Sequence, residues 1–565
     1  MNSEALKQTF LNTTPLAVEV LPFAKKTLTI SQQEFIELKW QASYWQTQHA
    51  RAVVREAELK EELQRKEAII RDLNQRLYGK SSEKGGSKSD VNPNAKNKKS
   101  TRKRGHQKGS ATHGRTQHPE LPVIPEVIPA LETACGLCGL DYSILPSYEE
   151  SSIIEIEVAA HIRRIQRQKC VKHCTCTLGS KIITAPLPPK LIPGSPYGNS
   201  IWEEILLSKF LYAQPINRTL NSFKNLGLNI APGTIAGGLK KIAPIFEPIY
   251  QALHQQQMTE NRFHNDETRW EVYETVEGKE GHRWYLWLTR STSVVYYCMD
   301  PTRSAAVPLA HFADLISKKV IVICDRYSSY KKLARLNLSV ILAFCWAHVR
   351  RDFLNLARSY PDLNQWGLDW AEAISKLFHL NNQRIEVWDP KLPLSWQSPL
   401  FKERHEALGI ALSEMKSHAD RLLAADKYSR EKKEKMSDIL ATIQRKVLVS
   451  LCEHWQGLTV FYDHPEVKMD NNPAEESMRN PVLGRNNYYG SGSLWSATLT
   501  AMIFSILQTL LLWNLNPKTW LHLYLEACAK NGGISPEDIG EFLPWKMSEA
   551  RRTQLSKPLN NNNTS

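Results

Sequence analysis

The sequence lacks the features that mark an exported or membrane-spanning protein. Its first ten residues contain no basic segment followed by an apolar run, so we expect no secretory leader. The longest apolar stretch, residues 501–513, is shorter than the ~20 residues that a membrane span needs. We expect that stretch to be a core helix packed under a sheet, with an interface as the alternative, and we expect a cytoplasmic protein without a membrane partner.

The sequence also lacks a nucleotide-binding loop, and its acidic residues do not outnumber its basic ones. The G-x-x-x-x-G-K-[ST] phosphate loop is absent, so the chemistry is expected to need no nucleoside triphosphate. The 565 residues contain 72 Lys and Arg against 58 Asp and Glu, a formal charge of +14. This balance favours a polyanionic partner, nucleic acid before membrane. A length of 565 residues predicts three or four folding units.

The N-terminal region, residues 31–80, has a helical apolar pattern. From Phe35 to Leu77 a heptad seam is apolar at ten of thirteen positions and is not interrupted by Pro or Gly. A stripe of period 3.5 predicts a coiled coil, and hence a homo-oligomer. One long amphipathic helix packed on its own chain is the alternative.

Residues 81–120 change abruptly to Gly, Ser, Asn, Lys and Arg, with almost no apolar side chain to bury. We predict a disordered basic linker that neutralises DNA phosphates, while a merely solubilising tether is the alternative. The candidate DNA contacts in this linker are Lys98, Lys99, Arg102, Lys103 and Arg104.

Five of the ten cysteines lie between residues 135 and 176, which favours a metal site over a disulfide framework. Cys135 and Cys138 form a C-x2-C pair whose thiolates can share one tetrahedral zinc ion. We predict that Cys170 and Cys174 complete a structural zinc site in a module at residues 121–183, with His173 and Cys176 as alternative ligands. Reduced free cysteines are the alternative to zinc.

Residues 196–256 predict short helices, which suit a DNA-binding helix-turn-helix and a helical spacer equally well. Alternating aromatic and β-branched residues then predict strands, and the apolar run 320–324 predicts a central strand buried on both faces. Asp325 directly follows that run, at the carboxyl end where active groups of α/β sheets collect. Asp266 lies inside an earlier strand, where a charge needs a reason. Either acid alone is also explained as a turn former or a surface charge.

A helix is predicted to begin near residue 472, with Asn472 as N-cap and Pro473 at the first helical position. Glu475 stands three residues after this cap, so a capping box explains it without any catalytic role. Further along, Arg479 and Arg485 are candidate contacts to phosphate or base edges.

Several ordered motifs resemble the IS66 family of bacterial insertion-sequence transposases, over about residues 35–545. The motifs are HNDETRW from His264, CDRYSSY from Cys324, CWAHVRR from Cys345, DNNPAE from Asp470 and LGRNN from Leu483, preceded by RLYGKSSEK from Arg76 and APLPPKLIP from Ala185. The resemblance implies an α/β protein with a ribonuclease-H-like catalytic domain at residues 260–510. A helical insertion is placed at about residues 350–460, and a helical extension and tail at residues 511–565.

The resemblance also implies an acidic triad of Asp266, Asp325 and Glu475. Three such carboxylates can hold two Mg²⁺ ions about 4 Å apart, which suits in-line attack on a phosphodiester. Strand alternation directs Glu267 away from Asp266, and Glu476 is rotated about 100° from Glu475 on the helix. The family has a basic residue where this chain has Glu476.

The implied activity is binding of the element's terminal inverted repeats, 3′-end cleavage and joining to target DNA. Arg350 and Arg351 are candidate phosphate contacts, with a solvated helix face as the alternative explanation. Cys345 and His348 are expected to support the site rather than to bind zinc. Companion proteins of the same element are left open as partners. An inactive DNA-binding relative and a nuclease of the same fold without strand transfer are the alternatives.

Overall fold

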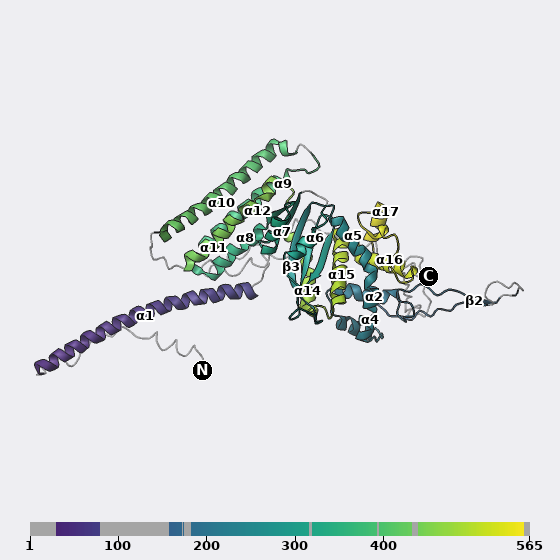
Figure 1. The fold of residues 1–565 in the computed structure, drawn as a ribbon, viewed down its shortest axis with the longest axis horizontal. Coiled ribbons are helices and arrows are strands. Elements are labelled where there is room, and N and C mark those ends of the chain that lie inside the picture. The colour runs from purple at the N-terminus through teal and green to yellow at the C-terminus, as the bar shows by residue number, and fades with distance from the viewer. Residues whose placement is uncertain are drawn as a thin grey trace, which may run out of the picture. The chain divides into compact units, whose positions relative to one another are not determined.

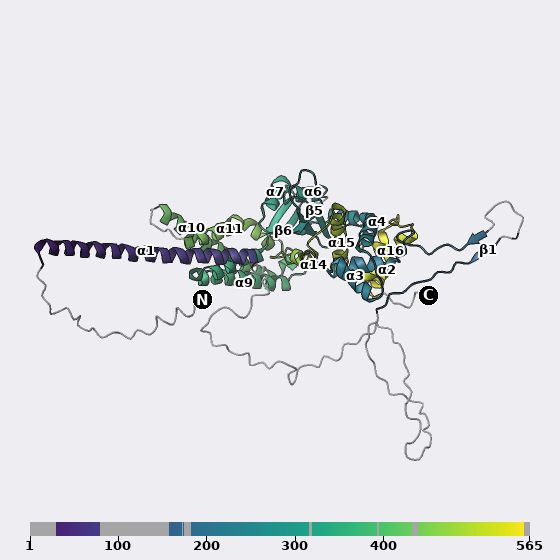
Figure 2. The ribbon, with the colours of Figure 1, turned by 90° about the horizontal axis from the view of Figure 1, so that it is seen from below.

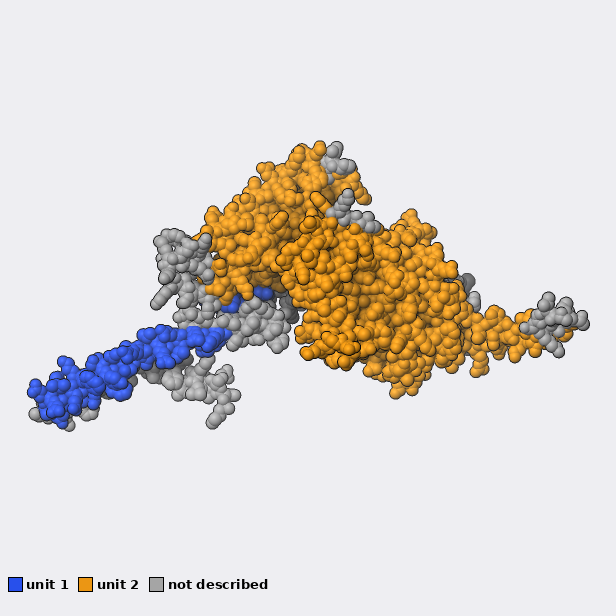
Figure 3. All heavy atoms as spheres, in the orientation of Figure 1, with its two compact units in different colours: residues 1–82, 355–364 blue, residues 83–354, 365–565 orange. Residues whose placement is uncertain are grey.

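The computed structural model describes residues 30–78, 158–171, 173, 182–315, 319–392, 395–431 and 439–558. Contacts divide the chain into two units, residues 1–82 with 355–364, and residues 83–354 with 365–565 (Figure 3). The predicted linker and three of the four predicted zinc ligands lie outside the described residues, namely Cys135, Cys138 and Cys174. Cys170 is an exposed free cysteine on β1 (Lys169–Val171), which pairs with β2 (Ile182–Thr184). The zinc site therefore stays a prediction.

The first unit is dominated by the long helix α1 (Gln32–Tyr78). Ser31 and Glu34 exchange hydrogen bonds at its start, and Lys60 pairs with Glu56 one turn away at 2.7 Å. The predicted helix is confirmed. Apolar side chains of α1 between Phe35 and Leu63, such as Trp45 at 66% exposure, are uncovered, and pairing with a second copy stays a prediction.

In the second unit the predicted helical region follows β1 and β2, and a π-helical turn (Leu207–Leu211) directly continues its first helix, α2. The helices are α2 (Asn199–Leu206), α3 (Ile216–Asn225), α4 (Pro232–Ile242) and α5 (Glu247–Gln257), with a 3-10 turn at Ala243–Phe246 between the last two. Their apolar faces join one core with the sheet and the C-terminal helices.

A five-stranded mixed sheet lies at the centre of this unit (Figure 1). Its strand order is β5-β4-β3-β6-β7. β3 pairs antiparallel with β4, and β4 with β5, whereas β3, β6 and β7 run parallel. The strands are β3 (Arg262–Glu271), β4 (Arg283–Arg290), β5 (Val295–Asp300), β6 (Val320–Cys324) and β7 (Val340–Phe344). Every residue of β6 is buried, as its continuous apolar sequence predicts.

Helices cover both faces of the sheet. Figure 2 shows α6 (Ala306–His311) and α7 (Ser328–Leu336) on one side of β5 and β6, and α14 (Asn472–Tyr488) on the other.

The apolar helix α15 (Leu494–Leu512) contacts the edge strand β5. Its Ser505 and Thr509 hydroxyls accept hydrogen bonds from the Tyr297 and Val295 amides, at 2.8 and 3.0 Å. α15 thereby satisfies donors that the sheet edge would otherwise leave open. By length and composition α15 alone among the described helices could cross a membrane, but 67% of its apolar window is buried. The predicted core helix is confirmed.

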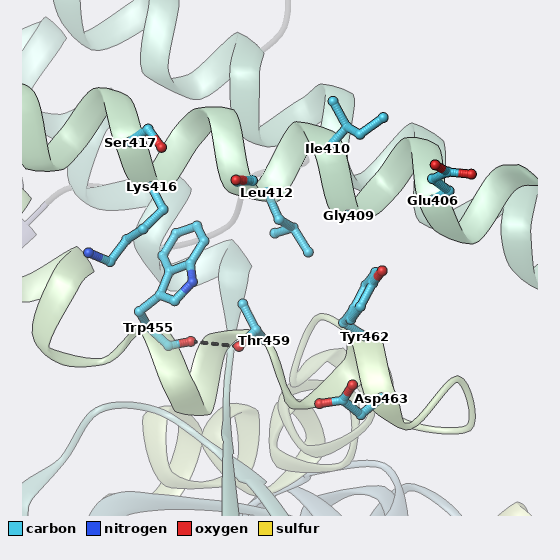
Figure 4. Close-up of a pocket in the computed structure, with 11 residues that line it drawn as sticks. Glu406, Gly409, Ile410, Leu412, Lys416, Ser417, Trp455, Thr459, Tyr462 and Asp463 are labelled. Carbon is cyan, nitrogen blue, oxygen red and sulfur yellow. Dashed lines mark hydrogen bonds between the residues drawn. The ribbon is translucent and has the colours of Figure 1, made fainter. Parts of the chain in front are cut away.

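A helical region separates β7 from α14. It contains α8 (Trp346–Ser359), α9 (Asn364–Glu386), α10 (Pro399–Glu431), α11 (Ile439–Glu453), α12 (Trp455–Leu458) and α13 (Val460–Asp463), with 3-10 turns at Pro361–Leu363 and Ser395–Gln397. A cavity of about 580 Å³ lies between α10 and the α12–α13 segment, lined in part by Lys416, Trp455, Thr459 and Tyr462 (Figure 4). None of the three candidate acids lines it.

The chain ends in α16 (Pro517–Lys530), a 3-10 turn at Gly540–Phe542, and α17 (Glu549–Ser556). Trp520 and Tyr524 of α16 are fully buried in the core that also contains α2 and α15. The expected C-terminal helical extension is therefore an integral layer of the second unit.

Candidate active site

The parallel register of β3 and β6 brings two candidate acids to the same level of the sheet. His264 pairs with Ile323 at the last registered position, so two further residues along each strand reach Asp266 and Asp325. Residues in register on parallel neighbours project from the same face. Because Asp325 directly follows the buried strand β6, its carboxylate stands at the carboxyl edge.

The third candidate acid comes from the first turn of α14, and here the predicted cap is wrong by one residue. α14 begins at Asn472, and Asn471 occupies the cap position without any side-chain capping bond. The capping box through Glu475 does not form either, since the Glu475 carboxylate contacts Arg351 and His348 instead. The capping-box explanation for Glu475 is therefore wrong.

Asn471 uses its side chain to join elements that are far apart in the sequence. Its Nδ2 donates to the Asn265 carbonyl at 2.8 Å, so its Oδ1 is the atom that accepts from His264 Nδ1 at 3.0 Å. Its backbone amide donates to Cys345 Sγ at 3.2 Å. Only 2% of Asn471 is exposed. This residue therefore ties β3, the end of β7 and the start of α14 together.

The Glu475 side chain extends from α14 toward α8. Its Oε1 is 3.6 Å from a terminal guanidinium nitrogen of Arg351 and 3.9 Å from His348 Nε2. Burial, followed by the nearby charge of Arg351, lowers the pKa of His348 to about 4, so the ring is neutral at pH 7. Arg351 is thus the cation that contacts this carboxylate.

The two aspartates sit in a field that disfavours their ionised forms. Burial, and then the negative charges of Glu267, Asp325 and Glu475, raise the pKa of Asp266 well above its usual range. A hydrogen bond from the Glu267 amide to Asp266 Oδ1, at 2.9 Å, only partly offsets this. Burial also raises the pKa of Asp325, against a hydrogen bond from the Tyr327 amide and nearby cations. Repelling acids of this kind are typical of sites that take up cations.

A second network, which the sequence did not reveal, lies behind these acids. Glu267 is buried, and its Oε1 accepts from Arg303 at 2.6 Å while its Oε2 accepts from the Tyr330 hydroxyl at 2.5 Å. The ring of Tyr327 lies under the Arg303 guanidinium at 4.0 Å. Tyr330 belongs to α7, on the face opposite α14, which agrees with the expected strand alternation. No motif marks Arg303 in the loop after β5.

Glu476 takes no part in this cluster. Its side chain is 70% exposed, and its nearest basic partner is Arg290, at 3.6 Å. Arg290 donates to the Pro473 carbonyl and the Ser477 hydroxyl, and thereby attaches α14 to β4.

The predicted arginine contacts fall into different settings. Arg350 donates to Ser375 of α9, and Arg485 donates to Thr268 Oγ1 and the Arg269 carbonyl, which braces α14 on β3. Arg479 is exposed on α14. Arg351 faces Glu475, as described above.

Across the described ranges, no three His, Cys, Asp or Glu side chains are close enough to hold a metal ion as they stand. The donor set nevertheless suits a hard divalent cation, because it consists of carboxylates whose charges repel one another. Cys345 and His348 do not form part of a metal group either. Burial raises the pKa of the Cys345 thiol to about 11, which keeps it protonated, and the supporting role of this pair stays a prediction.

Comparison with known proteins gives the family. Residues 194–499, more than half of the chain, match the family described as Transposase IS66 family. The chain is 24% identical over 445 residues to the uncharacterized protein y4jD of Sinorhizobium fredii, which covers 75% of this chain and 80% of that protein. It is 23% identical over 447 residues to the uncharacterized protein y4hP of the same organism, covering 74% of each. No solved structure matches significantly. The chain belongs to the IS66 family of transposases.

Proposed function

We propose that this chain cleaves the 3′ ends of its own insertion element and joins them to target DNA, using Asp266, Asp325 and Glu475. The observation that carries the proposal is the field around Asp266, whose pKa is raised by burial and by the charges of both other acids. Such repulsion has a cost in stability that a purely structural arrangement would avoid.

The sheet supports a ribonuclease-H-like catalytic domain. In sequence order, three antiparallel strands are followed by two that run parallel to β3, and β3, the first of the five, lies at the centre of the sheet. The first acid lies on that central strand and the second at the end of its parallel neighbour. The third comes from a helix after an inserted helical region.

Two Mg²⁺ ions are the proposed cofactors, and when bound they would activate the attacking oxygen and stabilise the leaving oxygen of a phosphodiester. Asp266 and Asp325 would hold them from adjacent strands. Glu475 would first have to leave Arg351, because the two side chains are now in contact. An arriving DNA phosphate would compete for the Arg351 guanidinium and release Glu475. Asn471 would keep α14 beside β3 throughout.

The proposed partners are element ends, target DNA and further copies of this chain paired through α1, in the cytoplasm at the nucleoid. The net charge of +14 and the uncovered apolar side chains of α1 support this assignment. A zinc module at residues 121–183 and companion proteins of the element remain part of the proposal.

Cleavage of labelled element-end DNA with Mg²⁺ tests the proposal. We expect Asp266→Asn, Asp325→Asn and Glu475→Gln to lose at least 10³-fold in cutting while they retain end binding, since each removes a metal-type ligand. Glu476→Gln is the matched control and should keep both properties. Full cleavage by the Glu475→Gln variant would contradict the triad. Cleavage without joined products in the unaltered protein would identify a nuclease instead.

A further inference from the structure

The exposed surface of α14 forms a stripe that starts beside the candidate acids. Exposed side chains recur every three or four residues along the helix at Glu476, Arg479, Leu483 and Asn486. The stripe ends at Tyr489, the residue that terminates α14. Fourteen residues separate Tyr489 from Glu475, or about 21 Å at the helical rise. At 3.4 Å per nucleotide, that length corresponds to about six nucleotides of one DNA strand.

Tyr489 has a backbone conformation that is unfavourable for a residue with a Cβ atom. Its φ is +65°, in the left-handed region that helix ends usually assign to glycine or asparagine. The side chain is nevertheless 70% exposed, so burial does not compensate for the strain. Strain of this kind, held by a large exposed aromatic residue, is typical of binding sites.

A second exposed tyrosine stands next to the same helix end. Tyr212 is 61% exposed and precedes Ala213, another non-glycine residue with positive φ, at +55°. Asn487 Nδ2 donates to the Ala213 carbonyl at 2.8 Å, which links this segment to the end of α14. Within the described ranges, neither tyrosine ring stacks on another ring or lies under a cation, since none of the ring contacts found there involves them.

Exposed cations lie on α14 and on the strand beside it. The Arg269 side chain of β3 is 56% exposed next to the Arg485 bracing contact, and its guanidinium also pairs with Glu271 at 3.4 Å. Arg479 lies on the stripe itself. Free aromatic faces with neighbouring cations suit unpaired nucleotides, because every base can stack on a ring while the cations meet the phosphates.

We propose that Tyr489 and Tyr212 form a stacking platform for unpaired bases of the DNA, about six nucleotides from the candidate acids. The choice of DNA as the ligand rests on the proposed function. The additional site would bind unpaired bases by stacking and would not bind duplex DNA. In this proposal, stacking of a base on the Tyr489 ring offsets the cost of its strained backbone.

The test measures binding without added Mg²⁺, so that cleavage does not enter. Element-end duplexes carry a single-stranded extension with 2-aminopurine at successive positions, and stacking is followed by quenching of its fluorescence. We expect Tyr489→Ala and Tyr212→Ala to weaken binding of the extended DNA about tenfold each and to remove quenching at one or two positions. Blunt duplex should bind unchanged, and Tyr489→Phe should behave like the unaltered protein.

Two controls separate binding from folding. Tyr489→Gly should raise the melting temperature, because it relieves the strain, and yet bind the extended DNA as weakly as Tyr489→Ala. Leu338→Ala, at a residue 91% exposed in the α7–β7 loop, should change neither. Equal binding by Tyr489→Gly and the unaltered protein would overturn the platform alone. Absence of DNA binding by the unaltered protein would overturn the proposed function as well. Lost self-association with unchanged DNA affinity would reassign the surface to a protein contact.

Discussion

Replacing Asn471 by alanine is the perturbation that the structure specifies most fully. The side chain joins β3 to the start of α14 through two hydrogen bonds, to the Asn265 carbonyl and to His264. Burial lowers the pKa of His264 to about 4, so its ring is neutral at pH 7 and donates its Nδ1 proton to the amide oxygen. Alanine would leave a buried carbonyl and a buried ring N–H without these partners.

The expected loss follows from these two groups. A buried polar group that loses its partner costs about 1–3 kcal/mol, so for two such groups we expect the free energy of unfolding to fall by about 2–6 kcal/mol. For a domain of this size each kcal/mol lowers the melting temperature by about 2 °C, which gives a fall of about 4–12 °C. Since α14 carries Glu475, even an ~1 Å displacement would lower DNA cleavage about 10²-fold.

Thermal melting, together with cleavage of element-end DNA, measures both effects. The matched control is Asn472→Ala, because the neighbouring asparagine is exposed and donates only its backbone amide, to Asp470. That variant should melt within about 1 °C of the unaltered protein, in keeping with an exposed site. If the two alanine variants lost equal stability, the helix would be capped as the sequence predicts, and the assignment of Asn471 would be wrong.

Three further perturbations test separate parts of the account. Asp266→Asn should raise the melting temperature at pH 7–8, by an amount that shrinks as the pH falls toward 4. The raised pKa makes ionisation of Asp266 less favourable in the folded chain than in the unfolded one, by about 1.4 kcal/mol for each tenfold change in its acid dissociation constant. A pH-independent difference between the two proteins would contradict this explanation. Arg351→Ala should increase Mn²⁺ affinity in the absence of DNA by up to about fivefold in a calorimetric titration, because it frees the third acid; an unchanged affinity would remove its proposed hold. Gly490→Ala should destabilise the fold by more than about 3 kcal/mol in denaturant melts, since an added Cβ would lie 2.1 Å from the Glu271 carbonyl oxygen. Gly492→Ala is the control, because a Cβ at that position meets no atom within 4 Å. Equal losses of stability in the two variants would refute this packing.

The regular elements were predictable because their periodicities are local. The apolar run 320–324 predicted β6 to the residue, and the heptad seam predicted α1. β7 was not singled out, although the apolar run 340–344 was available as a signal. The pairing partners of α1 and the ligands of the zinc module remain predictions.

The details of the candidate site depended on long-range contacts. Positions 471 and 472 are both asparagine, so the local sequence does not distinguish them. The position of His264, about 200 residues away in the chain, decides that Asn471 anchors the helix. The local sequence around Glu475 favours a capping role, whereas in the fold its carboxylate contacts Arg351 of the distant helix α8. Nothing in the local sequence connects Arg303 to Glu267, since their contact arises from the way β3 and the loop after β5 meet.

The central claim is that three acids share divalent cations once DNA is bound. The most direct measurement is the crystal structure of the full chain with element-end DNA and Mn²⁺, in which anomalous scattering locates the metal. The account predicts metal in contact with the carboxylates of Asp266, Asp325 and Glu475, and Arg351 turned from Glu475 to a phosphate. Metal bound elsewhere, or a Glu475 still held by Arg351 beside bound DNA and metal, would contradict it.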